Sequence, residues 1–290
     1  MTTQVDVNSK KSLKAMLLVT MRHYQLTSEP GVSSLTDHVT SEDDKTGNHE
    51  KIQLSLVLPV YNEAQSIEHT INELYHEIST KTGAEIIVRE GGSTDGTKEV
   101  LLKMSESLPL KPILRERKGG YMKDVKDGLR NTNTRHVFFI DSDGQYAASD
   151  FWKLYDKIDD FDMIVGRKVR RADPIHRIIL SKVFHKTIGV VFKLPLHDPD
   201  CGYRIINRNV LEEVLEEVKF LEYSFWSEFT IRAFKKGFRI VEIPIQHRKR
   251  LSGGTKLYTP DRILTIMLLQ FIGLLRLWKE LRKQQRLTPS

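Results

Sequence analysis

Three short polar motifs each follow a run of apolar, mostly β-branched residues in the first half of the chain. The runs LSLVLPV, AEIIVR and HVFFI are predicted strands, and the stretches between them have helical character. This alternation predicts an α/β fold with a mainly parallel central sheet flanked by helices. Because parallel strands end at the same edge of such a sheet, where ligands bind, the three motifs are expected to meet in one crevice.

The pattern divides the chain into three parts. Residues 1–50 are polar without a sustained period, and we expect a poorly ordered extension there. Residues 51–256 are expected to form the α/β domain, and residues 257–290 an amphipathic C-terminal helix. Strands are predicted at 54–60, 84–89, 110–115, 136–140, 162–166 and 238–246. Helices are predicted at 64–80, 95–107, 120–131, 174–193, 208–218 and 224–236, with a loop at 197–204.

Composition narrows the class of partner. The 290 residues carry a formal charge of +7, which favours phosphorylated ligands, an anionic membrane surface or nucleic acid. An acidic crevice does not suit nucleic acid, so no nucleic-acid partner is expected. The single cysteine, Cys201, excludes an internal disulfide and suits a reducing compartment. No run reaches the roughly 20 apolar residues of a membrane span, and no signal peptide is expected.

The third motif carries two neighbouring carboxylates. Asp141 and Asp143 follow HVFFI directly, and two carboxylates beyond a strand end can converge on one hard divalent cation. Gln145 would add an amide oxygen. Such a cation would bridge a diphosphate and neutralise it as a leaving group. A solvated Asp-Ser-Asp-Gly turn is the alternative interpretation, and the two neighbouring motifs favour the metal site.

The other two motifs are suited to a nucleotide. Residues 90–97, EGGSTDGT, form a turn that leads into a helix, whose free N–H groups suit an anion or a nucleotide edge. Residues 59–63, PVYNE, offer an aromatic ring for base stacking and a carboxylate for a ring or ribose donor. The alternatives are a plain glycine turn with a helix cap, and a strand that ends at a proline.

Taken together, the motifs resemble those of family 2 glycosyltransferases of the GT-A fold. The resemblance is to the dolichyl-phosphate or polyprenyl-phosphate sugar synthases, which are hexosyltransferases, and runs from about Leu54 to Leu275. Its parts are PVYNE, EGGSTDGT, DSDGQY, the Gly166-Arg167 strand end, DPDCGYR and the segment Arg250–Lys256. Their order and spacing together are specific, although no single motif is.

The resemblance implies a role for each motif. Mg²⁺ or Mn²⁺ would be held against the donor diphosphate by Asp141, Asp143 and Gln145. The nucleotide-sugar donor, of GDP-mannose or UDP-glucose type, would be bound by Pro59, Tyr61, Glu63, Glu90, Gly91, Asp141, Ser142, Asp143, Gln145 and Arg167. The acceptor phosphate would be bound by Arg177, Arg250 and Lys256. The residues expected to act in the transfer step are Asp143, Arg250 and Lys256.

The second motif departs from the family pattern. The family usually has two acidic residues where this chain has Glu90 and Gly91, and the second commonly contacts the nucleotide base. Gly91 has no side chain, so Glu90 or a backbone group would have to substitute. The identity of the base, uridine or guanosine, is therefore open. The segment Lys118–Asp124 is also more charged than the small-residue version usual in the family.

The expected reaction is direct displacement at the anomeric carbon, with the inversion that the resemblance implies. A lipid phosphate is largely a dianion at neutral pH and needs cations rather than a general base. A hydroxyl acceptor of a glycan or small molecule would need a base, for which Glu228 and Asp200 are candidates. The spacing of Glu228 and Arg232 favours a structural ion pair. A non-catalytic nucleotide-binding module is a further alternative.

The C-terminal helix suggests where the protein acts. Its apolar face is expected to lie at the boundary of lipid headgroups and acyl chains, with its cations toward anionic lipid. Those cations are Arg276, Lys279, Arg282, Lys283 and Arg286. Packing on the domain or on a second subunit, as in a homodimer, is the alternative. We expect a peripheral protein on the cytoplasmic face of a membrane.

Overall fold

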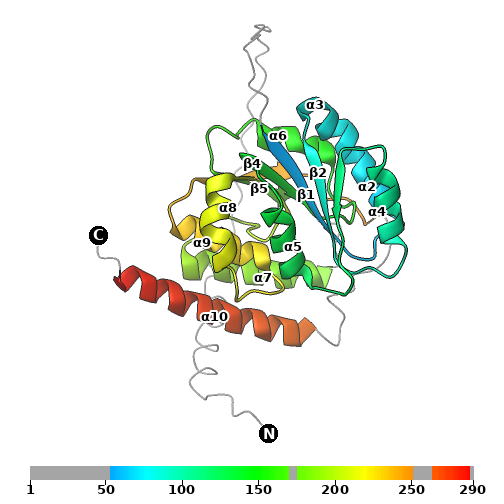
Figure 1. Cartoon of the computed structure of the whole chain (residues 1–290). Coiled ribbons are helices and arrows are strands. Elements are labelled where there is room, and N and C mark those ends of the chain that lie inside the picture. The colour runs from blue at the N-terminus through cyan, green and yellow to red at the C-terminus, as the bar shows by residue number, and fades with distance from the viewer. Residues whose placement is uncertain (1–52, 170–174, 251–262, 288–290) are drawn as a thin grey trace. The chain divides into compact units, whose positions relative to one another are not determined.

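A seven-stranded sheet forms the centre of the computed structural model, with strand order β3-β2-β1-β4-β6-β5-β7 (Figure 1). The structure describes residues 53–169, 175–250 and 263–287, all within the unit formed by residues 52–290. The expected extension at 1–50 lies outside the described residues. The strands are β1 (Leu54–Val60), β2 (Glu85–Glu90), β3 (Leu110–Ile113), β4 (His136–Ile140), β5 (Met163–Lys168), β6 (Tyr203–Asn207) and β7 (Ile240–Ile245).

The sheet is parallel except at one strand. β6 runs antiparallel to both of its neighbours, β4 and β5, and the other pairs are parallel. The α/β fold with a mainly parallel sheet is therefore confirmed. The strand β6 was not predicted: it begins within the loop expected at 197–204 and ends directly before α8, where a helix was expected from 208. YRIIN has only two aliphatic residues, so its pattern does not distinguish a strand from a loop end.

Helices flank the sheet (Figure 1). They are α2 (Ile67–Leu74), α3 (Thr80–Thr82), α4 (Thr97–Ser105), α5 (Tyr121–Arg130), α6 (Phe151–Tyr155), α7 (Ile175–Phe192), α8 (Arg208–Val214), α9 (Phe225–Lys235) and α10 (Ile263–Leu287). A π-helical turn, Tyr75–Ser79, joins α2 to α3, so the helix predicted at 64–80 forms with one local irregularity. The short α6 was not predicted. α5 packs against β1 and β2 (Figure 1).

The two central strands are entirely buried. Every residue of β1 and of β4 is buried, which explains why both are nearly continuous apolar runs in the sequence. Pro59 lies beyond Val57, the last residue of β1 that pairs with β4, so a proline fits there. This core holds the ends of β1, β2 and β4 rigidly at one edge of the sheet.

α10 lies along α7 and packs on the domain (Figure 1). Gln270 is buried and donates to the Ser224 hydroxyl at 2.8 Å. The buried apolar residues of α10 are Ile266, Phe271, Leu274, Leu277 and Leu281. Most of the apolar face therefore packs within the chain, which was the alternative to an apolar face in lipid. None of the helices in the described ranges combines the length and hydrophobicity that a membrane crossing requires.

Candidate active site

The first two motifs interlock at the edge of the sheet. The Asn62 backbone N–H donates to the Ser93 hydroxyl at 2.9 Å, and the Asn62 side chain accepts from the Thr94 N–H at 2.9 Å. The Glu63 N–H donates to the Thr97 hydroxyl at 3.0 Å. Asn62 has a positive φ of 54°, a conformation that asparagine tolerates better than most residues. The turns after β1 and β2 are thus fixed to each other, as the strand-end argument predicts.

Arg250 joins the first motif to the third. Its guanidinium donates to the Glu63 carboxylate and lies 3.9 Å from Asp143 Oδ2. Glu63 is itself buried and accepts from the Ser66 hydroxyl at 2.8 Å. Burial raises the pKa of Glu63, while Ser66 and Arg250 oppose that shift. The three motifs and the basic segment at 250 therefore meet in one place, although they are far apart in the sequence.

The Asp141 side chain, at the end of β4, is closely surrounded by residues of other elements. The Tyr121 hydroxyl donates to Asp141 Oδ1 at 2.9 Å, and the Trp226 indole donates to the Tyr121 oxygen at 3.2 Å. A side chain at Gly202 would collide with the Asp141 carboxylate. Burial raises the pKa of Asp141 to about 7, with the negative charge of Asp143 as the second cause. A cation would relieve both effects at once.

The donor set at this position fits a hard divalent cation. Asp143 Oδ1 accepts from the Gln145 N–H at 3.2 Å, and the Gln145 amide nitrogen donates to the Arg248 carbonyl at 3.2 Å. Over the described residues no cluster of three or more His, Cys, Asp or Glu is suited to a metal ion. Mg²⁺ and similar ions are often held by one or two carboxylates together with substrate phosphates. The aspartate pair and Gln145 match that mode of binding.

The two candidate bases lie in different environments. Asp200 accepts from the Ser227 N–H at 3.0 Å, and burial raises its pKa to about 6. Glu228 is fully buried, accepts from three backbone N–H groups and is 2.8 Å from Arg232. A carboxylate so enclosed cannot reach a substrate, so Glu228 is part of the scaffold. Asp200 is therefore the one of these two candidate bases whose position still allows that role.

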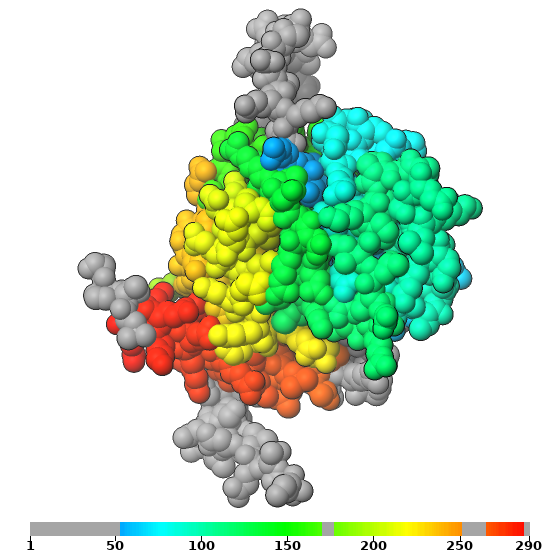
Figure 2. Space-filling view, in the orientation of Figure 1, coloured from blue at the N-terminus to red at the C-terminus, as the bar shows by residue number. Residues whose placement is uncertain are grey.

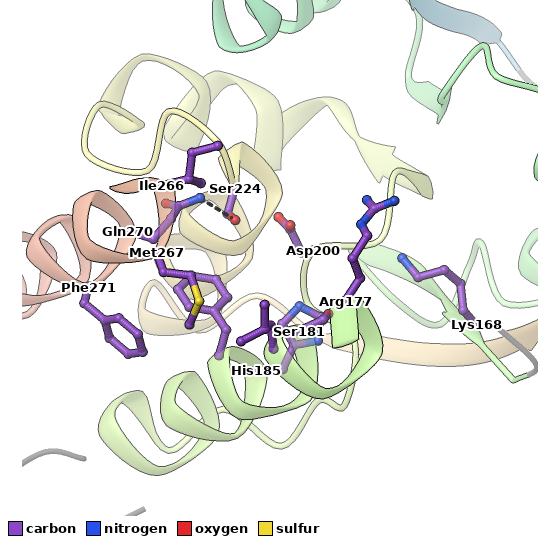
Figure 3. A pocket seen from close by; sticks show the side chains of 12 residues that line it. Lys168, Arg177, Ser181, His185, Asp200, Ser224, Ile266, Met267, Gln270 and Phe271 are labelled. Atoms are coloured by element: carbon purple, nitrogen blue, oxygen red, sulfur yellow. Dashed lines mark hydrogen bonds between the residues drawn. The ribbon is translucent and has the colours of Figure 1, made fainter. Parts of the chain in front are cut away.

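A cavity of about 220 Å³ lies beside Asp200, between α7 and α10 (Figure 3). Figure 3 shows Lys168, Arg177 and Asp200 at one end and Ile266, Met267 and Phe271 toward the other. Leu180 and Phe184 of α7 add to the apolar lining. The cavity therefore has a charged end near the crevice and an apolar end between two helices.

A basic groove of about 510 Å³ adjoins this cavity. The two share Lys168 and His185. The cations of the groove are Arg167, Lys168, Lys182 and Lys186. Arg167, which was expected at the donor phosphates, lines this groove and is not a lining residue of the cavity beside Asp200.

The remaining predicted donor residues occupy several environments. Glu90 is fully buried and accepts from the Ser93 and Arg115 N–H groups, so its side chain shapes the turn and does not face a ligand. Pro59 and Ser142 are buried. The Tyr61 ring has the Lys118 ammonium 4.7 Å from its centroid. Lys256 lies outside the described residues.

Sequence reasoning missed two functional candidates. Lys168 lines both the cavity and the groove and pairs with Asp198 at 3.2 Å. It ends β5 one residue after the predicted Arg167, so the strand end itself was the available signal. Tyr121, which contacts Asp141, begins α5 in the segment already noted as unusually charged.

The model of glycosyl transferase family 2 matches residues 55–215. The chain belongs to this family. It is 28% identical over 215 residues to polyprenol monophosphomannose synthase of Mycolicibacterium smegmatis, over 70% of this chain and 80% of that protein. It is 26% identical to the undecaprenyl-phosphate 4-deoxy-4-formamido-L-arabinose transferase of Salmonella choleraesuis, over 74% of this chain and 65% of that protein. The match spans slightly less than two thirds of the second relative.

Solved structures of glycosyltransferases share the fold. Glucosyl-3-phosphoglycerate synthase of Mycobacterium tuberculosis, solved with Mn²⁺, UDP-glucose and phosphoglyceric acid, aligns with a TM-score of 0.59 at 17% identity, over 79% of this chain and 80% of that one. The mannosyltransferase PcManGT of Pyrobaculum calidifontis, solved with GDP-mannose and Mn²⁺, aligns with a TM-score of 0.54 at 16% identity, over 97% of this chain and 86% of that one. The chain is a glycosyltransferase with the GT-A fold.

Proposed function

We propose that this glycosyltransferase moves a hexose from a nucleotide-sugar to the phosphate of a polyprenyl or dolichyl phosphate, with Mg²⁺ or Mn²⁺. The observation that carries the proposal is the cavity beside Asp200, which has Lys168 and Arg177 with Asp200 at one end and is apolar at the other. A phosphate joined to a long hydrocarbon chain likewise has one charged end and one apolar part. The names of two relatives, a polyprenol monophosphomannose synthase and an undecaprenyl-phosphate sugar transferase, support this class of acceptor.

The lining residues support an assignment for each part of the acceptor. Lys168 and Arg177 would hold the phosphate, Arg177 through two parallel hydrogen bonds and Lys168 as a point charge. Phe184, Met267 and Phe271 would contact the start of the hydrocarbon chain. At about 220 Å³ the cavity is smaller than the roughly 300–1,000 Å³ of a pocket for a drug-sized ligand. The rest of the chain would therefore lie outside, in the bilayer.

The crevice supplies the other half of the reaction. Asp141, Asp143 and Gln145 would hold the cation, which when bound neutralises the diphosphate leaving group. Arg250 lies close to Asp143 and would contact the same phosphates, together with Lys256. The acceptor phosphate oxygen would attack the anomeric carbon from the opposite side, with inversion. Because that oxygen is already anionic, the residues need only position it and balance its charge.

A second candidate acceptor is a hydroxyl group, and one observation favours it. Burial raises the pKa of Asp200 to about 6, close to the range in which a carboxylate works as a general base at neutral pH. Asp200 would then take the proton of a glycan or small-molecule hydroxyl. The apolar end of the cavity has no role in that reaction, so we rank the lipid phosphate first.

A peripheral position at a membrane follows from the same acceptor. Leu268 and Leu269 of α10 are 50% and 46% exposed, and Ile179 and Val190 of α7 are 54% and 44% exposed. In the space-filling view α10 lies at the surface along the lower edge of the domain, beneath α8 and α9 (Figure 2). These side chains, with the cations of both helices, would rest on an anionic bilayer, on the cytoplasmic face. A homodimer through α10 is the alternative use of this surface.

Transfer of labelled sugar tests the proposal directly. The full chain would be incubated with Mn²⁺, detergent-solubilised polyprenyl phosphate and radiolabelled GDP-mannose or UDP-glucose. We expect label in the organic phase, and no label there when EDTA removes the metal. Label that appears only on a water-soluble hydroxyl acceptor would overturn the lipid-phosphate assignment and favour Asp200 as a base.

A pair of arginine variants sharpens the same assay. Arg177→Ala removes a cavity cation and is expected to raise the KM for the lipid phosphate about 10-fold or more, with the donor KM unchanged. Arg239→Ala is the matched control, because the Arg239 side chain is 62% exposed and does not line the cavity. Equal effects of the two substitutions would contradict the assignment of the cavity.

A further inference from the structure

The space beside Gly91 is occupied by a side chain from another element. Gly91 follows β2, and its N–H donates to the Val60 carbonyl at 2.8 Å. It is buried and is not among the glycines with positive φ, so its backbone suits any residue. A Cβ there would lie 2.8 Å from Asp124 Oδ2, closer than such atoms approach. Space, and not backbone conformation, is therefore what favours glycine at this position.

Asp124 reaches this position from α5 and keeps one oxygen without a hydrogen bond. Its side chain is buried and lies 3.3 Å from the Arg115 guanidinium. The oxygen that faces Arg115 is Oδ1, which is 3.3 Å from Arg115 Nε, and neither of these two buried atoms makes a hydrogen bond among the described residues. Burial raises the pKa of Asp124, and the charges of Arg115 and Arg89 oppose that shift. The Asp124 carboxylate is thus held by charge and not by a hydrogen bond, and an N–H group from a ligand would supply one.

The surroundings of Asp124 belong to the crevice. Val60, whose carbonyl faces Gly91, directly precedes Tyr61, and the Lys118 ammonium lies over the Tyr61 ring. A side chain at Gly92 would collide with the backbone of Arg117 and Lys118, so the segment before α5 covers this turn closely. The Asp124 carboxylate thus lies where the ends of β1 and β2 meet the start of α5. The first residue of α5, Tyr121, contacts Asp141, so Asp124 lies one helical turn from the residue that contacts the aspartate pair, within reach of the far end of a bound nucleotide.

We propose that Asp124 is the residue that selects the base of the nucleotide-sugar donor. Its carboxylate would accept the ring N–H of uracil or guanine, in the space that a side chain at residue 91 would otherwise fill. This proposal rests on the proposed function, since it assumes a nucleotide-sugar donor. The expectation that Glu90 substitutes for the missing acid is replaced, because the Glu90 oxygens already accept backbone N–H groups.

The chemistry of the bases makes the choice specific. Uracil and guanine present a ring N–H beside a carbonyl, whereas cytosine and adenine present a bare ring nitrogen at the equivalent position. An ionised carboxylate only accepts hydrogen bonds, so it pairs with the first two and is repelled by the second two. Because the Asp124 side chain is buried, a base that places a bare nitrogen against it loses this hydrogen bond and is repelled, and binds more weakly.

Binding of nucleoside diphosphates to the full chain tests this without relying on transfer. Calorimetric titrations with Mn²⁺ would compare UDP, GDP, CDP and ADP. We expect UDP or GDP to bind best, and the two arms show which base the crevice accommodates. Asp124→Asn should weaken that binding about 10- to 100-fold and strengthen CDP, because an amide can donate to the bare nitrogen of cytosine. Tight CDP or ADP binding by the unaltered chain would overturn the proposal.

Asp127→Asn is the matched control. Asp127 lies one turn along α5 and pairs with the same Arg115 and Arg89, but it is more exposed than Asp124. Its substitution should loosen those arginines and leave the base preference unchanged. If Asp124→Asn and Asp127→Asn change affinity for all four diphosphates alike, Asp124 has a structural role only.

Exchanging the two positions gives a gain that a structural role does not predict. Gly91→Asp alone should lose UDP and GDP binding, because its side chain collides with the Asp124 carboxylate. Adding Asp124→Ala removes both the collision and the charge repulsion, and should restore the original preference to within about 10-fold of the parent. The double variant also tests the proposal if Asp124→Asn does not fold.

If no diphosphate binds the unaltered chain, the assumption of a nucleotide-sugar donor is wrong, and the proposed function is wrong with it. If UDP or GDP binds but the exchange restores nothing, the Asp124 proposal alone fails.

Discussion

The buried charged side chains of α9 and those of the crevice differ in how completely they are paired. In α9, Glu228 and Arg232 are both fully buried, and each makes several contacts. Glu228 accepts three backbone N–H groups, while Arg232 also contacts Glu280 at 2.9 Å. In the crevice, burial raises the pKa of Asp141 and of Asp200, and Asp124 retains an oxygen without a hydrogen bond.

This difference in pairing distinguishes residues that stabilise the fold from residues that bind a ligand. A buried ion pair with every hydrogen bond made is stable in itself and offers a ligand nothing. Carboxylates whose ionised form is disfavoured by burial and by neighbouring negative charge become more stable when a cation or an N–H donor binds, so perturbed groups mark functional sites. Arg204 is an intermediate case: it is fully buried, donates to backbone carbonyls and stacks 4.1 Å from the Trp226 ring centroid, yet burial lowers its pKa to about 10.

The largest expected effect comes from breaking the scaffold pair. Arg232→Met leaves Glu228 buried without its partner and should lower the free energy of unfolding by about 3–5 kcal/mol. Arg250→Met, at a position that is 27% exposed, should change stability by less than about 1 kcal/mol while transfer activity falls. Urea unfolding of both variants measures the contrast. Equal losses of stability would mean that the two regions do not differ as the contacts indicate.

The sequence predicted the frame of the site better than its details. The strand ends and the three motifs could be placed because β1, β2 and β4 are short apolar runs followed by polar turns. Local periodicity could not reveal β6, whose Arg204 is buried by contacts with Thr230 and Trp226, both more than 20 residues away in the sequence. Nor could it show that Asp124 reaches Gly91 or that Lys168 joins Asp198. Those pairings depend on how helices and strands pack, and no local pattern encodes that.

A smaller effect of opposite sign is expected at Asp200. Its folded-state pKa of about 6 lies above the ordinary value of 3.8, so the unfolded chain loses this proton first as pH rises. The folded state is therefore penalised increasingly from about pH 4 to pH 6 and constantly above. Asp200→Asn should raise the free energy of unfolding of the metal-free protein by about 1–2 kcal/mol at pH 8, and by less at pH 5.

Glu228→Gln provides the comparison for Asp200→Asn. It weakens a fully paired carboxylate, so it should lower stability at both pH values. Chemical unfolding at pH 5 and pH 8 would measure all three proteins. A loss of stability in Asp200→Asn at pH 8 would show that Asp200 is a scaffold residue like Glu228.

The smallest expected effect probes where the distinction between the two regions stops. His136 begins β4, is buried, and has no hydrogen bond on either ring nitrogen among the described residues, yet it lies at the opposite end of its strand from Asp141. Burial lowers its pKa from 6.5 to about 4, so the ring stays neutral in the folded state. Burying a neutral ring costs far less free energy than burying a carboxylate, so His136 needs no ligand.

The depressed pKa of His136 predicts how the free energy of unfolding changes with pH. The contribution of His136 is fully present above pH 6.5 and is lost as pH falls toward 4, because the unfolded chain binds the proton first. His136→Leu should therefore remove about 1 kcal/mol of the destabilisation between pH 7.5 and pH 5.5, measured by urea unfolding at each pH. An unchanged pH dependence would place the titrating groups in the crevice instead.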